Sequence, residues 1–286
     1  MALTSTARPD ATPTAPPSKA PRRGPLRWVR DNIVTIAGIF ALVYLLVPNV
    51  VVVVFSFNDP VGRFNYSWNT FSLDAWANPC AVAGMCESLA LSLQIGLLAT
   101  LSALVLGTLV AFALSRHRFR GRSSTNLLVF FPMATPEVVM GSSLLALFVN
   151  LRFPLGFGAI LIAHIMFLVS YVVVTVKARL ASLDPRLEQA AMDLYANERT
   201  TFWRITFPLV LPGIAAAGLL AFALSFDDFI ITNFNAGPEV TFPMFVWGAA
   251  QRGVPPQVNV IGALMFILAL TVVAGSELAR RRKARR

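Results

Sequence analysis

The sequence predicts an all-α polytopic membrane protein with six transmembrane helices, and three observations carry that prediction. Of the 286 residues, 56% are hydrophobic and only 13% are charged, whereas about 25% of the residues of a soluble domain are charged. The apolar residues gather in blocks about twenty residues long, which is the length that a helix needs to cross a bilayer. Finally, the Lys and Arg residues fall almost entirely in alternate segments between these blocks.

Composition divides the chain into three parts. Residues 1–30 are rich in Pro, Ala, Thr and Ser and contain too little apolar surface to order themselves, so we expect a disordered basic cytoplasmic tail. Residues 31–279 form the predicted six-span domain, which includes a cytoplasmic segment at residues 182–208. Residues 280–286, RRRKARR, are predicted to be a second basic cytoplasmic tail.

The apolar blocks and the turn residues between them set the predicted spans. Pro132 and Pro136 break span three, and Pro154 with Gly156 marks the turn before span four. The spans are residues 33–57, 88–115, 126–151, 157–176, 211–232 and 258–276. The apolar stretch TFPMFVWGAA lies in the second outer loop and is too short to cross, so we expect it to be interfacial or re-entrant.

The positions of Lys and Arg predict the orientation. With the N-terminus inside, the inner segments contain 21 of the 24 basic residues, and the outer side has only Arg63, Arg152 and Arg252. This asymmetry predicts that both termini are cytoplasmic. The net charge of +10 is then explained by anionic lipid headgroups, and the sequence gives no reason to expect nucleic acid as a partner.

No motif for chemistry is visible. The sequence has no zinc-ligand spacing, no Cys-x-x-Cys and no phosphate-binding loop of the GxxxxGK[ST] type. Only His117 and His164 are present, and we interpret His164 as a polar residue packed inside the helix bundle. We therefore expect no catalytic residue, no metal site and no cofactor in this chain, which is not predicted to be an enzyme.

The stretch at residues 182–213 is the one long segment that is neither strongly apolar nor low in complexity. Asp184 followed by Pro185 predicts a helix start. The small apolar residues that follow recur at helical spacing on one face: Leu187, Ala190, Ala191 and Leu194. A turn is predicted around residues 195–197, and then a second short helix that carries Phe202 and Ile205 and is closed by Pro208.

Within this stretch, EQAAMDLYAN followed by FWRITFPLVLPGI resembles the EAA loop of permease subunits of ATP-binding-cassette importers. The matching positions are Glu188, Ala190, Ala191, Asp193, Leu194, Ala196, Pro208 and Pro212. The resemblance implies that the loop forms a coupling helix that sits in a groove of an ATPase subunit, with the first six of these residues at the contact. The family usually has Gly where Tyr195 stands. If that position needs a positive φ, Tyr costs about 1–2 kcal/mol, unless the turn uses Asn197 instead.

Three other stretches are similar to the spermidine/putrescine permease subfamily: PEVVMGSSLL, AHIMFLVSYVVVTV and SFDDFIITNFNAGPEVTFPMFVWGAAQRG. The resemblance implies a type I importer fold in the bacterial cytoplasmic membrane. It also implies a second homologous permease, two ATPase subunits that bind ATP and Mg, and an extracytoplasmic substrate-binding protein. Two alternatives stay open: an importer permease for another small solute, and a self-sufficient secondary transporter.

The candidate substrate path centres on the motif SFDDF. Asp227 and Asp228 lie near the outer end of predicted span five, flanked by Phe226 and Phe229, and Glu137 lies in span three. A carboxylate within a span usually faces a cavity or a partner, and it can compensate the charge of a cation. Because successive helical residues point about 100° apart, we expect one aspartate to face the path and the other to meet a partner protein. The alternative is that both aspartates are wet and only terminate the span. Glu137 follows Pro136, and the sequence leaves open equally whether it lines the path or caps the helix locally.

The first outer loop contains both cysteines, Cys80 and Cys86, with Gly84 between them. A disulfide would close a short loop, but a helical PCAVAGMC would hold the two sulfurs too far apart. The sequence leaves the two possibilities nearly equal.

Overall fold

The computed structural model describes residues 32–284. The predicted tail at residues 1–30 therefore lies outside the described residues, as do the last two residues of the predicted C-terminal tail. The chain divides into two compact units, residues 1–51 and 52–286, and each is described by itself.

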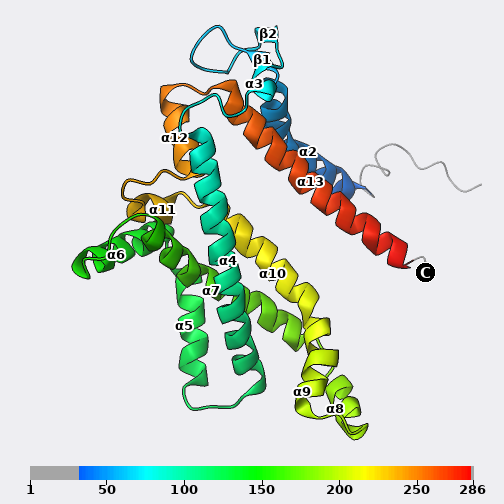
Figure 1. Cartoon of the computed structure of the whole chain (residues 1–286). Helices are drawn as coiled ribbons and strands as arrows, with labels where there is room; N and C mark the ends of the chain where they lie inside the picture. Colours follow the sequence, from blue (N-terminus) through cyan, green and yellow to red (C-terminus); the bar gives the residue numbers. More distant parts are fainter. Residues whose placement is uncertain (1–31, 285–286) are drawn as a thin grey trace, which may run out of the picture. The chain divides into compact units, whose positions relative to one another are not determined.

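Helices make up almost all of the regular structure (Figure 1). They are α2 (Ile33–Phe55), α3 (Asp74–Ala77), α4 (Met85–Arg116), α5 (Arg122–Ala134), α6 (Glu137–Asn150), α7 (Phe157–Ala181), α8 (Arg186–Asp193), α9 (Glu198–Thr201), the π-helical turn η1 (Phe202–Thr206), α10 (Phe207–Asp227), α11 (Ile230–Asn235), α12 (Phe242–Arg252) and α13 (Pro256–Ala284). The two short strands β1 (Asn58–Asp59) and β2 (Thr70–Phe71) form an antiparallel pair in the loop that follows α2.

Within the described residues, four helices are long and apolar enough to cross a membrane: α2, which begins in the first unit, and in the second unit α4, α7 and the continuous helix from Glu198 to Asp227. The pair α5 and α6 makes a fifth span if its two helices are counted together. In α13 the described apolar part, Pro256–Val272, is shorter. The chain is thus a membrane-spanning helical protein, and the count of six spans stays a prediction.

The break in predicted span three is confirmed, and it is sharp. Helices α5 and α6 are bent by 106° at Thr135 and Pro136. Pro136 lies at the break, because a residue before proline is pushed towards extended backbone and Thr135 has ψ 131°. Pro132 lies inside α5, so only one of the two prolines that were expected to break the span does so.

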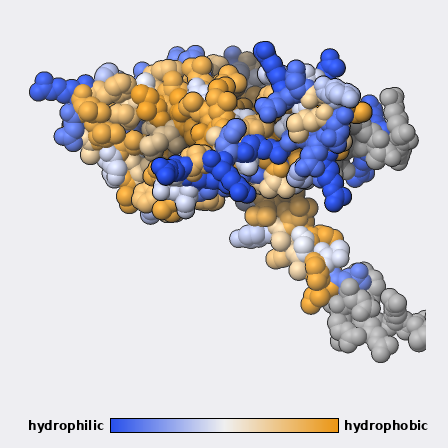
Figure 2. Space-filling view, turned by 90° about the horizontal axis from the view of Figure 1, so that it is seen from below, coloured by the Kyte–Doolittle hydropathy of each residue, from blue (hydrophilic) through white to orange (hydrophobic). Residues whose placement is uncertain are grey.

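The core of the second unit is formed by α4, α7 and α10, which pack against one another. Small residues allow these helices to approach closely. A Cβ atom built on Gly107 of α4 would lie 2.7 Å from Val172 Cγ1 of α7, and Ala103 and Ala163 are fully buried in the same core. Outside this core, Figure 2 shows apolar side chains over much of the face in view, as expected for helices that meet lipid.

Two expectations about the last third of the chain are wrong. Pro208 does not close the second short helix, because the chain stays helical from Glu198 to Asp227. The π turn η1 directly precedes α10, with the Phe207 N–H bonded to the carbonyl of Phe202. Pro208 follows this wider turn, and the helix continues through it. Predicted span five also stops early: α10 ends at Asp227, and α11 begins at Ile230.

Candidate substrate cavity and coupling segment

A cavity of about 750 Å³ lies where the two helix breaks meet, with α7 alongside. Its wall includes the break between α5 and α6 and the break between α10 and α11. Of the five residues predicted for the substrate path, four line it: Glu137, Asp227, Asp228 and Phe229. These residues are far apart in the sequence, so the fold brings them together.

Asp227 is the acid best placed to meet a solute. Its side chain is exposed, and among the described residues no hydrogen bond or ion pair engages its carboxylate. Asp227 also lines a second cavity of about 450 Å³, with Phe226, Phe229 and Trp247. The rings of Phe229 and Trp247 lie 5.4 Å apart. The fifth predicted residue, Phe226, thus lines this second cavity rather than the first.

Asp228 faces the interior of the chain, although it also contributes to the cavity wall. Its side chain is only 5% exposed. The Oδ2 atom accepts hydrogen bonds from the backbone N–H and the hydroxyl of Thr232, both at 2.7 Å, and lies 3.3 Å from His164 Nε2. Asp228 therefore holds the start of α11, and the expectation that the second aspartate meets a partner protein is wrong for a carboxylate satisfied within its own chain.

His164 of α7 completes this network. The ring lies between Ser225 of α10, 2.7 Å from Nδ1, and Thr232 of α11, 3.0 Å from Nε2. Since the Thr232 hydroxyl already donates to Asp228, Nε2 must carry the hydrogen that is donated to Thr232. The interpretation of His164 as a packed polar residue is confirmed, and its role is to join three helices beside the cavity.

Glu137 is exposed at the first position of α6 and lines the main cavity. A carboxylate at a helix N-terminus is stabilised by the helix dipole, and within residues 32–284 no hydrogen bond or ion pair engages the Glu137 side chain. The carboxylate therefore remains open to the cavity.

Two aromatic residues of the cavity were missed by the sequence reasoning. Phe167 and Tyr171 of α7 line the cavity beside the acids, and their rings are in edge contact, 6.3 Å apart. With His164 they recur at i, i+3 and i+7, which puts them on one helical face. That spacing was the available signal, but in an apolar helix it resembles ordinary packing.

The coupling segment folds as predicted at its start and differently at its turn. Asp184 Oδ1 accepts a hydrogen bond from the Arg186 backbone N–H at 2.9 Å, which caps α8. Tyr195 has φ 62°, so the position does take the left-handed conformation that suits Gly. Asn197 has φ −77° and instead caps α9, accepting from the Thr200 N–H at 2.8 Å. The alternative that Asn197 makes the left-handed turn is therefore wrong.

Glu188 ties α8 to the rest of the chain. Its Oε1 atom accepts from Arg116 Nη2 at the end of α4, at 2.5 Å, and from the Thr206 hydroxyl of η1, at 2.7 Å. The role of Arg116 was missed, because 72 positions separate it from Glu188 and sequence alone gives no contact between them.

The apolar stripe of α8 is divided between the chain and its surroundings. Ala191 is buried within the chain, and its carbonyl accepts from the Ala196 N–H at 3.1 Å. In contrast, the other three members of the stripe are exposed: Ala190, Leu187 and, at 81%, Leu194. Asp193, outside the stripe, is also exposed. Only the exposed members of the stripe are available to another protein.

A second interaction fixes α10, the helix that follows this segment. Arg179, near the end of α7, donates from Nε and Nη2 to the carbonyl of Leu209 in α10, at 3.0 and 2.7 Å. A Cβ atom built on Gly213 would lie 2.5 Å from Arg179 Cγ. Glycine is therefore required for the arginine to reach this carbonyl.

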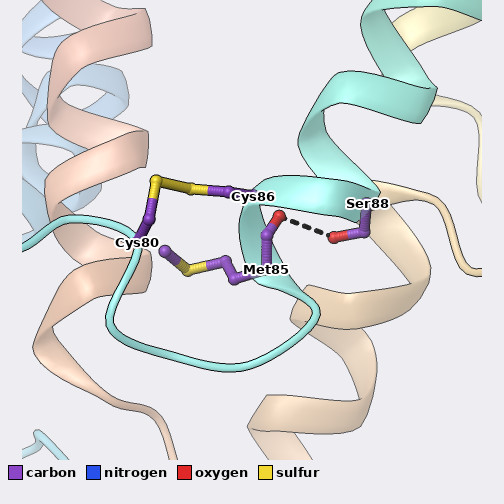
Figure 3. The surroundings of a disulfide bond; sticks show 4 residues. All are labelled: Cys80, Met85, Cys86 and Ser88. Carbon is purple, nitrogen blue, oxygen red and sulfur yellow. Dashed lines mark hydrogen bonds between the residues drawn. A yellow bond between two sulfur atoms is a disulfide. The ribbon is translucent and has the colours of Figure 1, made fainter.

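In the loop between α2 and α4, Cys80 and Cys86 form a disulfide (Figure 3). Gly84 has φ 78°, which turns the loop back into α4 and places Cys86 in the first turn of that helix. Residues 81–84 are not helical, so the geometric objection to a bridge does not apply. In the same part of the chain, the Ser88 hydroxyl donates to the Met85 carbonyl at 2.9 Å.

Within residues 32–284, no group of three or more His, Cys, Asp or Glu side chains is arranged to hold a metal ion. The candidate site is a cavity lined by carboxylates and aromatic rings, and the chain runs from α7 through α8 into α10.

Comparison with known proteins agrees with this arrangement. Residues 103–281 match the family described as binding-protein-dependent transport system inner membrane component. The match covers more than half of the chain, which therefore belongs to this family of transporter membrane subunits.

Two similar proteins are permeases named for polyamine transport. The chain is 35% identical over 243 residues to the spermidine/putrescine transport system permease protein PotC of Escherichia coli (strain K12), covering 85% of this chain and 91% of the relative. It is 36% identical over 231 residues to the putrescine transport system permease protein PotI of the same organism, covering 78% and 82%.

Among solved structures, a bacterial alginate ABC transporter in complex with an alginate pentasaccharide-bound periplasmic protein matches with a TM-score of 0.64 at 13% identity. The match covers 90% of this chain and 97% of that chain. At this identity the likeness shows the fold alone, which is that of an ABC importer permease.

Proposed function

We propose that this permease forms one half of a translocation path for polyamines such as spermidine and putrescine. The observation that carries the proposal is the cavity in which Glu137 and Asp227 lie beside Tyr171 and Phe229. A polyamine is a flexible apolar chain with positively charged amines. Carboxylates compensate its charge, and aromatic faces attract its ammonium groups.

The proposal includes the rest of the transporter. A second homologous permease supplies the other half of the path, and an extracytoplasmic binding protein delivers the solute. Two ATPase subunits bind ATP and Mg, so this chain is itself not an enzyme. The chain spans the bacterial cytoplasmic membrane with both termini in the cytoplasm, as the positions of its basic residues indicate.

We further propose that the segment at residues 182–208 docks on the ATPase. The geometry supports the exposed residues Ala190, Leu194 and Tyr195 as the contact. Glu188 acts differently, since its bonds to Arg116 and Thr206 hold the coupling helix in place. Ala191 packs inside the segment and supports the same helix from within.

Reconstitution of the whole complex in liposomes tests the proposal. We expect uptake of labelled spermidine or putrescine that requires ATP, the binding protein and the ATPase. Uptake of an uncharged solute in place of polyamines would favour an importer permease for another cargo. Uptake without ATP or ATPase would favour a secondary transporter.

The docking proposal is tested in the same complex with a matched pair of variants. Ala190→Trp places a bulky side chain on the proposed contact and should abolish substrate-stimulated ATP hydrolysis by overpacking. Arg186→Trp places the same bulk on α8 away from the apolar stripe and should leave it near normal. Equal effects of the two variants, or normal hydrolysis with Ala190→Trp, would contradict this contact.

A further inference from the structure

An apolar groove of about 670 Å³ lies along the half of α4 that leads to Arg116. One wall is α4, from Leu104 to Arg116, and the other is formed by η1 and the start of α10, including Phe202, Trp203 and Phe207. Eight of the eleven residues that line the groove are apolar, and the polar ones are Thr108, Arg116 and His117. Arg116 and His117 lie together at one end of the groove.

This end of the groove is strongly basic. Arg116 uses one guanidinium nitrogen for Glu188 and, with five N–H donors in the group, retains donors for another acceptor. His117, Arg118 and Arg120 follow directly and are exposed. No ion pair in the described part of the chain engages these three side chains.

The length of the groove fits a lipid acyl chain better than a transmembrane helix of another subunit. The rise of 1.5 Å per residue gives about 18 Å from Leu104 to Arg116. One leaflet contributes about half of the 30 Å hydrocarbon core, so the groove matches one acyl chain. A helix of another subunit that crosses the bilayer would need a contact along the whole core.

We propose that the groove binds an anionic phospholipid, with an acyl chain between α4 and η1 and the headgroup phosphate against Arg116, His117 and the arginines that follow. A basic pocket at the end of a membrane helix is suited to an acidic headgroup. In the proposed topology this lipid belongs to the cytoplasmic leaflet. Its headgroup meets the same arginine that holds the coupling helix through Glu188, so the lipid also steadies that helix.

The experiment uses the assembled transporter in nanodiscs that contain phosphatidylglycerol or phosphatidylcholine with a photoactivatable group on the acyl chain. Labelled residues are mapped by peptide mass spectrometry. We expect phosphatidylglycerol to label the peptides around Leu109 and Phe207 several times more strongly than phosphatidylcholine does. This readout does not depend on which solute is transported, so it can fail or succeed separately from the polyamine proposal.

Two variants test the two parts of the site. Arg118→Gln should lower the preference for phosphatidylglycerol about fivefold, since each basic residue near an anionic surface contributes about 1 kcal/mol. Leu109→Trp should fill the groove and remove the label. The matched control is Leu101→Trp, because Leu101 is 60% exposed on the same helix but does not line the groove, whereas Leu109 is 63% exposed.

Equal labelling by the two lipids in the unmodified complex would overturn the proposal, as would even labelling along the exposed side of α4. Cross-links from this groove to a helix of the second permease would assign the groove to a subunit contact instead. These outcomes need no variant, so they remain decisive even if Leu109→Trp prevents assembly.

Discussion

Asp227→Asn removes one negative charge from the main cavity with almost no change in volume. The side chain is exposed and has no partner among the described residues, so the substitution breaks no contact within the chain. We therefore expect normal assembly and normal basal ATP hydrolysis, with slower import of polyamines. Asp227→Glu, which keeps the charge, should restore most of the import.

The size of the effect follows from Coulomb's law. A carboxylate and an ammonium group about 4 Å apart attract each other by about 1 kcal/mol in bulk water and about 4 kcal/mol at an effective dielectric constant of about 20. Solvent in the open cavity weakens this attraction, whereas the apolar residues of its wall strengthen it, so we take a value in the lower half of the range. A loss of about 1–2 kcal/mol corresponds to import that is about 5–30 times slower at low substrate concentration.

The assay is the initial rate of ATP-driven uptake of labelled spermidine into liposomes, with ATP hydrolysis measured in the same sample. Asp228→Asn is the informative comparison. Asp228 is bonded to Thr232 and lies next to His164, so its substitution should cost about 1–2 kcal/mol of stability and lower the yield of assembled complex. Asp227→Asn should thus slow import, whereas Asp228→Asn should lower the amount of assembled complex.

One result would refute the reasoning. If Asp227→Asn and the double variant with Glu137→Gln both import spermidine at the normal rate, the acids of the cavity do not compensate the charge of the solute. The polyamine proposal would then lose its physical support, although membership of the permease family would stand.

Three other predictions concern the framework of the protein. Tyr195→Gly should relieve a left-handed backbone that costs about 1 kcal/mol or more, so amide hydrogen exchange in the turn should slow about fivefold; faster exchange would show that the exposed tyrosine ring contributes contacts. Gly213→Ala should displace Arg179 and destabilise the chain by about 1–3 kcal/mol, seen as a lower thermal unfolding midpoint in detergent, and an unchanged midpoint would mean that the arginine shifts freely. Alkylation of unreduced protein followed by mass spectrometry should leave Cys80 and Cys86 unlabelled, and two labelled thiols would exclude the disulfide.

Local features of this chain were readable from the sequence because their causes lie within a few residues. The long apolar blocks predict membrane helices, since any unpaired backbone group in lipid is costly. Asp184 with Pro185 predicts the start of α8, because a cap needs only the side chain and the next backbone N–H groups. The break at Pro136 is local for the same reason.

Other expectations failed where the conformation of a residue depends on a neighbouring turn or on a distant helix. Pro208 is a helix breaker by propensity, but the π turn before it keeps the helix continuous. Asp227 and Asp228 form one motif in the sequence, yet the end of α10 leaves the first exposed and turns the second towards His164. Sequence spacing could not separate their roles, because the partner on α7 is 64 positions away.

The sequence by itself determined the class of protein, the resemblance to importer permeases and the types of residue that a cation path needs. Only the tertiary structure decided which of those residues meet. Glu137 and Asp227 share a cavity because two helices break at the same place in the bundle, and Arg116 reaches Glu188 because α4 ends beside α8. Periodicity reports the face of one helix, whereas a cavity or an ion pair depends on where several helices pack, which is set by close contacts such as that of Gly107 with Val172.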